Sequence, residues 1–136
     1  MPIAGLEPLK NVSYQPGVCN IGPAEIRRRR IAGHSGAIAT VLLFAVLAAA
    51  GVPHLLRLVV AIPAALSATG YIQARLHFCA NYGSRGVFNF GDPGSIEAVA
   101  DAEARAKDRR RSVRIGLASG AIGVVVGIVA ALLPIA

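Results

Sequence analysis

Residues 35–56 read SGAIATVLLFAVLAAAGVPHLL and contain no Lys, Arg, Asp or Glu. Two further stretches share this property, residues 58–74 and residues 115–136. A bilayer core about 30 Å thick needs roughly 20 apolar residues in a helix, and lengths of about 17–25 are tolerated. Inside each stretch the apolar residues occupy every face of a helix rather than one stripe, which suits a lipid environment. We therefore predict an all-α membrane protein with three transmembrane helices.

The composition of the whole chain supports this fold class. Of its 136 residues, 54% are hydrophobic and 15% are charged, whereas soluble domains carry roughly 25% charged residues. A small domain in water cannot bury so much apolar surface, which argues against a soluble enzyme. Disordered and fibrous proteins are disfavoured as well. Twelve of the fourteen basic residues are Arg, a bias that suggests a GC-rich bacterial genome.

The first two spans are predicted to form an antiparallel transmembrane hairpin over residues 31–78, because the link at residues 51–53 is short. Pro53 suits the first turn of the second helix, where no backbone hydrogen bond is lost. Pro63 lies inside the second span and predicts a kink there. A re-entrant hairpin that does not cross the bilayer is the alternative for this weaker span.

The basic residues predict the orientation. Five of them lie in residues 1–34 and eight in residues 75–114, whereas Arg57 alone lies near the link between the first two spans. Segments rich in Lys and Arg stay in the cytoplasm. We therefore expect a multi-pass protein of the cytoplasmic (inner) membrane, with the N-terminus in the cytoplasm and the C-terminus on the far side.

Three cytoplasmic segments are expected. Residues 1–30 begin with Pro and Gly at intervals that forbid a long helix, which indicates an extended arm. Residues 79–95 combine Gly and aromatic residues and are predicted to form a structured loop. From Ile96 onward neither Gly nor Pro interrupts the chain before the third span. We predict one long helix over residues 96–136, with Asp92 or Ser95 as the signal for its start. Its first half lies in the cytoplasm, and its second half forms the third span.

The third span carries four glycines at spacings of four, three and four residues: Gly116, Gly120, Gly123 and Gly127. Such spacing places them on one face of a helix, where a second helix backbone can approach closely. We predict a helix-packing surface here, for another helix of this chain or for another protein.

Two runs of arginine precede the first and third spans: Arg27, Arg28, Arg29 and Arg30, then Arg109, Arg110 and Arg111. Their predicted role is to anchor the topology at the lipid headgroups. Binding of anionic lipid is the more specific hypothesis. Nucleic acid is not an expected partner, because membrane orientation already explains the net charge of +7.

Candidate metal or cofactor ligands are Cys19, His34, His77 and Cys79. The predicted hairpin places His34 and His77 at similar depth, at the cytoplasmic ends of the first two helices. A zinc site of two Cys and two His, or a haem or chlorin held by the two His, is one hypothesis. Ordinary packing and hydrogen bonding is the other, and no cofactor is favoured.

Catalysis is not expected, because all seven acidic residues lie outside the spans and leave no carboxylate for a proton relay. The favoured function is a small accessory or structural subunit of a larger membrane complex. It would hold other membrane subunits by helix packing and by the cytoplasmic arm. The alternatives are a cofactor-binding membrane protein that uses His34 and His77, and a small homo-oligomeric transporter or channel.

Overall fold

The computed structural model describes residues 13–134. The first part of the predicted arm, residues 1–12, and the last two residues of the chain lie outside the described residues. The elements in chain order are α2 (Pro23–Ala49), the 3-10 helix η2 (His54–Val60), α3 (Ala61–Leu76), α4 (Ala80–Arg85), β1 (Val87–Phe88), β2 (Glu97–Ala98) and α5 (Ala102–Leu132).

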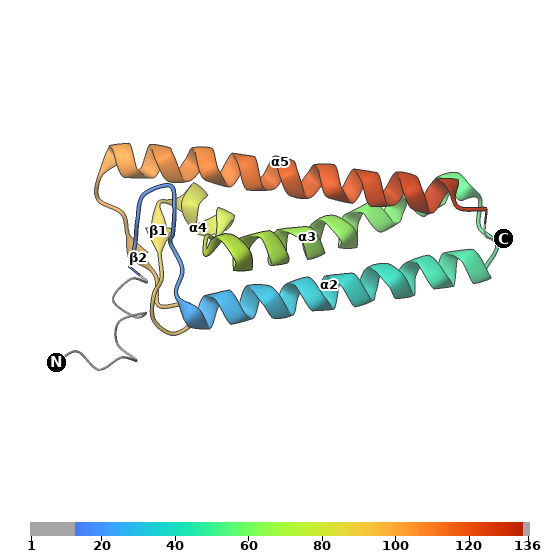
Figure 1. The fold of residues 1–136 in the computed structure, drawn as a ribbon, viewed down its shortest axis with the longest axis horizontal. Coiled ribbons are helices and arrows are strands. Elements are labelled where there is room, and N and C mark those ends of the chain that lie inside the picture. The colour runs from blue at the N-terminus through green and yellow to red at the C-terminus, as the bar shows by residue number, and fades with distance from the viewer. Residues whose placement is uncertain (1–12, 135–136) are drawn as a thin grey trace.

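Three helices are long and apolar enough to span a membrane: α2, the continuous segment of η2 and α3, and α5. They run side by side along the length of the molecule (Figure 1). Large apolar side chains such as Leu42 and Leu66 remain exposed on them, which suits lipid rather than water. The prediction of three helices able to span a membrane is confirmed, and such helices indicate a multi-pass membrane protein.

The three long helices form a layer with α3 in the middle. α3 contacts α2 on one side and α5 on the other (Figure 1). As a result α2 buries two of its 27 residues, Glu25 and Gly33. The two outer helices therefore present most of their surface to the surroundings.

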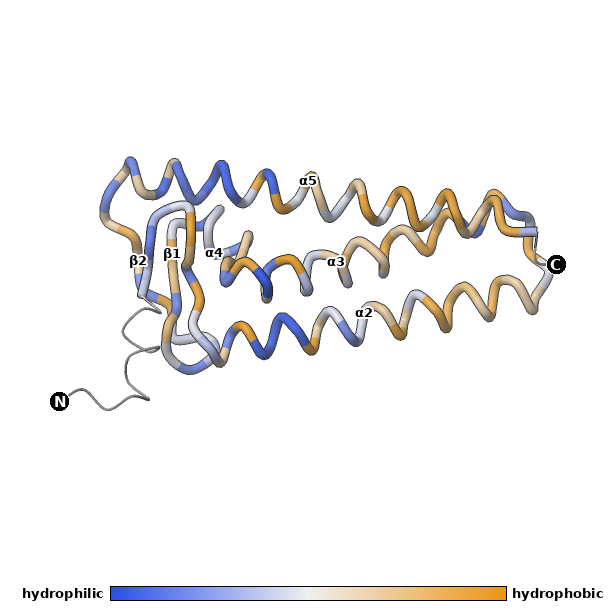
Figure 2. Tube along the Cα trace, viewed as in Figure 1, coloured by the Kyte–Doolittle hydropathy of each residue, from blue (hydrophilic) through white to orange (hydrophobic). Residues whose placement is uncertain are grey.

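One end of the layer is closed by a cap, which consists of residues 13–22 and 77–101. Within it β1 and β2 pair antiparallel, with Val87 opposite Ala98, and Ile21 forms a parallel bridge with Asn89. Ile21 also packs with Cys79 in a small apolar core. Figure 2 shows hydrophilic residues gathered toward this end and hydrophobic residues along the rest of the long helices.

Two of the predicted helix starts are wrong. α2 begins at Pro23, eight residues before the predicted hairpin, because Pro fits the first helical turn and the following arginines are good helix formers. α5 begins at Ala102 and not near Ile96, because residues 97–98 pair with β1. The side chain of Asp101 then accepts a hydrogen bond from the backbone N–H of Ala104, which makes Asp101 the N-cap.

The second span changes helix type along its length, from the 3-10 helix η2 to the α-helix α3. Pro63 lies in the first turn of α3, where its missing N–H costs no helical hydrogen bond. The irregularity predicted at Pro63 therefore lies just before it.

Arg57 is buried in η2, where it donates to the carbonyl of Leu133 at 3.2 Å and lies over the ring of Phe44.

Candidate functional site

A buried carboxylate lies in the cap. Glu25, in the first turn of α2, has no exposed surface. It accepts hydrogen bonds from the hydroxyl of Tyr82, from the amide of Asn89 at 3.0 Å and from the guanidinium of Arg29 at 3.0 Å. A buried charge is tolerated when it is paired and hydrogen-bonded. These contacts therefore hold together α2, α4 and the residue that follows β1.

A second buried side chain, Asn20, docks the segment that precedes α2. Its amide donates to the carbonyl of Cys79 at 3.1 Å and accepts from the backbone N–H of Cys79 at 2.7 Å. Its own backbone N–H donates to the carbonyl of His77, and its carbonyl accepts from the N–H of Asn89. Asn20 thus joins the end of α3 to the residue that follows β1.

A third buried group, Asp108, joins the same segment to α5. It accepts hydrogen bonds from the hydroxyl of Tyr14 at 2.6 Å and from the backbone N–H of Gly17 at 2.7 Å. Burial, and then the hydrogen bond to Asp108, raise the pKa of Tyr14. Burial and the hydrogen bond to Glu25 raise the pKa of Tyr82 in the same way. Both phenols therefore stay neutral where free tyrosine ionises.

These shifts predict that the cap loses stability at alkaline pH. An ordinary Tyr has a pKa of about 10, so the unfolded chain releases these protons as the pH passes about 10, whereas the folded cap retains them. In a Tyr71→Phe variant, tyrosinate absorbance comes from Tyr14 and Tyr82 alone, because the chain has three Tyr and no Trp.

The folded variant in mild detergent should show almost no tyrosinate at about pH 10, whereas the denatured chain should be about half ionised. The absorbance should appear only as the cap unfolds at higher pH. Half ionisation of the folded variant at about pH 10 would contradict the prediction.

The structure does not assemble the predicted site of two Cys and two His. Within residues 13–134, no group of three or more His, Cys, Asp or Glu is placed to hold a metal ion. The thiol of Cys19 donates to the carbonyl of Ile21 at 3.7 Å, and burial raises its pKa. The sulfur of Cys79 instead accepts a hydrogen bond from Arg29 at 3.0 Å.

His34 and His77 lie at different depths, which corrects the prediction that they are level. Because α2 begins at Pro23, His34 lies about three turns inside it and forms a 2.6 Å hydrogen bond with the hydroxyl of Tyr71. His77 follows the end of α3, six residues beyond Tyr71, a separation of about 9 Å along a helix. This geometry does not favour a haem or chlorin held between the two His.

The two arginine runs are not uniform. Five of their seven members are exposed: Arg27, Arg28, Arg30, Arg109 and Arg110. Arg29 is directed into the cap, and the guanidinium of Arg111 lies 5.9 Å from the ring centroid of Phe78. The role of the runs at the lipid headgroups stays a prediction, and two of their members also pack within the fold.

The glycine face of α5 is divided between two surroundings. A Cβ added to Gly123 would lie 2.7 Å from the backbone of α3, and one added to Gly127 would lie 3.1 Å from the backbone of η2. By contrast, a Cβ on Gly116 or Gly120 would meet no heavy atom of the described chain within 4 Å. Only one pair of the four glycines therefore packs inside the molecule.

A close approach between α2 and α3 was not predicted. A Cβ added to Gly70 would lie 2.6 Å from the backbone nitrogen of Gly33, and one added to Gly36 would lie 2.8 Å from the Cα of Ser67. The hydroxyl of Ser67 also donates to the carbonyl of Gly33 at 2.7 Å. The spacing of Gly33 and Gly36 beside the first span is the sequence signal that could have indicated this contact.

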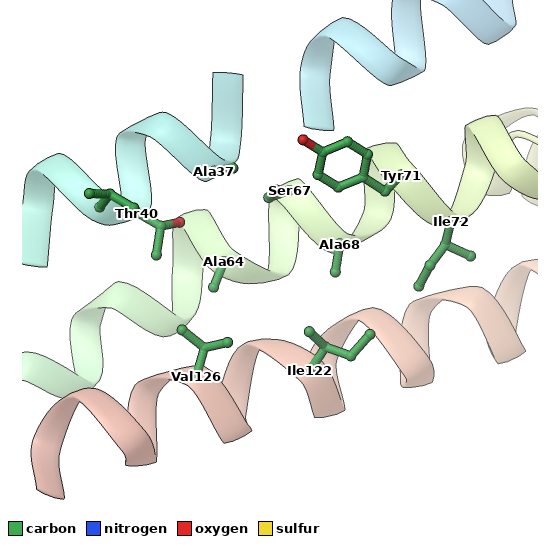
Figure 3. A pocket seen from close by; sticks show the side chains of 10 residues that line it. Ala37, Thr40, Ala64, Ser67, Ala68, Tyr71, Ile72, Ile122 and Val126 are labelled. Atoms are coloured by element: carbon green, nitrogen blue, oxygen red, sulfur yellow. The ribbon is translucent and has the colours of Figure 1, made fainter. Parts of the chain in front are cut away.

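A lateral pocket of about 430 Å³ opens between the three long helices (Figure 3). Its lining is mainly apolar, with small residues such as Ala64 and Ala68 of α3, and Thr40, Ser67 and Tyr71 supply its hydroxyl groups. Each of these hydroxyls already has a hydrogen-bond partner. The pocket therefore suits an apolar chain such as a lipid tail rather than a polar ligand.

Comparison of the chain with protein families, with curated proteins and with solved structures gives no match.

Proposed function

We propose that this chain is a small accessory subunit of a larger complex in the cytoplasmic membrane of a bacterium, with a structural rather than a catalytic role. Its three helices anchor it, and its outer helices pack against helices of other subunits. The cap faces the cytoplasm and offers a rigid polar surface beside them.

The observation that carries this proposal is the layered arrangement of the helices. α2 buries two of its 27 residues, because α3 separates it from α5. A three-helix protein that acts alone would bury more apolar surface by closing into a bundle. The layer instead leaves apolar faces on both outer helices, where transmembrane helices of other subunits can pack.

Gly116 and Gly120 on α5 supply a specific place for such a contact. Nothing in the described chain lies within 4 Å of a Cβ placed on either residue. Helix association in membranes relies on small residues of this kind, since they let two backbones approach closely. We assign this pair to a helix of another subunit.

The charge distribution supports a cytoplasmic cap. The polar first half of α5 carries Arg105, Lys107 and the second arginine run, and the first run lies at the start of α2. Both lie at the cap end of the layer (Figures 1 and 2). Basic residues that flank spans in this way favour the cytoplasmic side.

Replacing Gly120 with leucine should release the chain from its complex without unfolding it. A Cβ at this position has open space around it within this chain, but leucine would separate the two helix backbones, which costs about 1–3 kcal/mol and weakens association about tenfold or more. The matched control is Ala121→Leu, which adds leucine at the neighbouring exposed position, on another face of the helix.

The measurement is the native mass of the complex after mild detergent extraction from the host membrane. The unaltered chain and Ala121→Leu should retain the same stoichiometric subunits, and Gly120→Leu should lose most of them. A monomeric unaltered chain, or equal retention by both variants, would overturn the proposal.

A further inference from the structure

A basic pocket of about 440 Å³ lies where α2, α3 and α4 meet, beside the cap. The polar groups that matter in its lining are Arg28, Arg29, Gln73, Cys79, Tyr82 and Arg85. Two of the three arginines come from α2 and the third comes from α4, and η2 and α3 lie between these helices in the sequence. The fold therefore brings together positive charge from two distant segments.

One of these guanidinium groups is held rigidly. Arg29 donates to the carboxylate of Glu25 and to the sulfur of Cys79, each at 3.0 Å, and lies over the ring of Tyr82. Its side chain is 14% exposed. Because its position is fixed before any ligand arrives, an anion that binds there loses little free energy in ordering it.

The carboxylate that pairs with Arg29 is not accessible from the pocket. Glu25 has no exposed surface, and its oxygens accept hydrogen bonds from Tyr82, Asn89 and Arg29. An anion that enters the pocket therefore meets guanidinium groups and amide donors rather than the Glu25 oxygens.

The other two arginines are exposed groups that can close on a ligand. Arg28 is 63% exposed and lies 3.9 Å from Glu25, and Arg85 makes no ion pair with any residue of the described segment. Gln73 is 7% exposed. Its oxygen accepts from the N–H of Ala80, while its amide nitrogen donates to no described residue. Planar guanidinium groups with an amide donor suit the oxygens of a phosphate.

An apolar track continues from the pocket along α3. Thr69 also lines the pocket, and Leu66 and Ile62 follow it at helical spacing on the same face as Gln73. Leu66 is 64% exposed and Ile62 is 63% exposed. A ligand with a phosphate in the pocket can therefore lay an apolar chain along the helix.

We propose that this pocket binds the headgroup phosphate of an anionic phospholipid, with an acyl chain along Leu66 and Ile62. Arg29 is the fixed contact, and Arg28 and Arg85 close over the phosphate. A soluble phosphate ester offers the same phosphate chemistry but lacks the apolar chain, so the test compares both.

The test removes the two exposed arginines of the pocket and compares them with two that lie outside it. The pocket pair is Arg28→Gln with Arg85→Gln. The control pair is Arg27→Gln with Arg75→Gln, which removes the same charge from exposed residues near the same end of the helices. Circular dichroism in mild detergent checks that both variants remain folded.

Binding is measured by native mass spectrometry of the delipidated full chain with phosphatidylglycerol, with phosphatidylcholine and with glycerol phosphate as competitor. We expect phosphatidylglycerol to bind in preference to phosphatidylcholine, the pocket pair to weaken this binding about tenfold or more, and the control pair to weaken it less than about twofold.

Equal weakening by the two pairs would overturn the site, because the arginines would then act only through surface charge. Displacement of phosphatidylglycerol by glycerol phosphate at equal concentration would overturn the proposal that the ligand is a lipid, since the acyl chain would then contribute nothing to binding.

Discussion

Replacing Glu25 with alanine should open the cap while the three long helices remain helical. The variant leaves Arg29 without its carboxylate and leaves the hydroxyl of Tyr82 and the amide of Asn89 without their acceptor. Removing one partner from a buried ion pair costs about 3–5 kcal/mol. The long helices keep their own backbone hydrogen bonds in the bilayer, so the loss is confined to the cap.

Alkylation of the two thiols measures this opening, because Cys19 and Cys79 both lie in the cap and are 8% and 2% exposed. A loss of about 3 kcal/mol should raise their rate of alkylation by about 100-fold. Glu25→Gln should have a smaller effect, since the amide oxygen still accepts a hydrogen bond.

The matched control for this change is Glu97→Ala, which removes an exposed carboxylate from β2 in the same cap. Surface changes of this kind lie within about 0.5 kcal/mol. If Glu25→Ala and Glu97→Ala gave the same alkylation rates, Glu25 would not hold the cap together.

The long helices could be predicted from the sequence because their signal is local. A charge-free run such as residues 35–56 meets the length requirement of a bilayer by itself. The ends of the helices were harder to predict. Ile96 lies in a segment of good helix formers, yet the neighbouring residues 97–98 form a strand with residues 87–88. Pairing with a second segment overrode local helix propensity, and no local pattern shows it.

The cap could not be predicted for a related reason. Glu25 is one of seven acidic residues and lies beside a run of arginine. From the sequence alone it is therefore expected to be an ordinary surface charge. Its partners Tyr82 and Asn89 are 57 and 64 residues away. The same holds for Asp108, whose partner Tyr14 is 94 residues away. Buried polar networks of this kind depend on tertiary contacts that the spacing of residues does not reveal.

The glycines show that their spacing predicts only part of the helix packing. The four glycines on α5 predicted a packing surface, and two of them do lie against the second span, whereas the other two have open space beside them. The close contact between α2 and α3 uses Gly33 and Gly70, which are each less conspicuous in the sequence. Only the register between α2 and α3 brings them face to face.

Replacing Gly70 with leucine should therefore separate α2 from α3. The added Cβ alone would lie 2.6 Å from the nitrogen of Gly33 and 2.7 Å from the carbonyl oxygen of Arg29. Both are backbone atoms, which cannot rotate away as a side chain would. Overpacking costs about 1–3 kcal/mol and occasionally more, and leucine at this crossing should lie at the upper end. The gain in helix propensity of about 1 kcal/mol does not offset it.

The separation can be measured as a distance between spin labels in the Leu42→Cys, Ile62→Cys pair, with both native Cys replaced by Ser. These positions lie on α2 and α3 and are 60% and 63% exposed, so the labels should not disturb the packing. Gly70→Leu should lengthen and broaden the distance distribution, and Gly70→Ala should do so less. The control Gly120→Leu should leave it unchanged, because nothing in the described chain lies within 4 Å of a Cβ there. An unchanged distribution in Gly70→Leu would mean that this close approach does not set the spacing of the two helices.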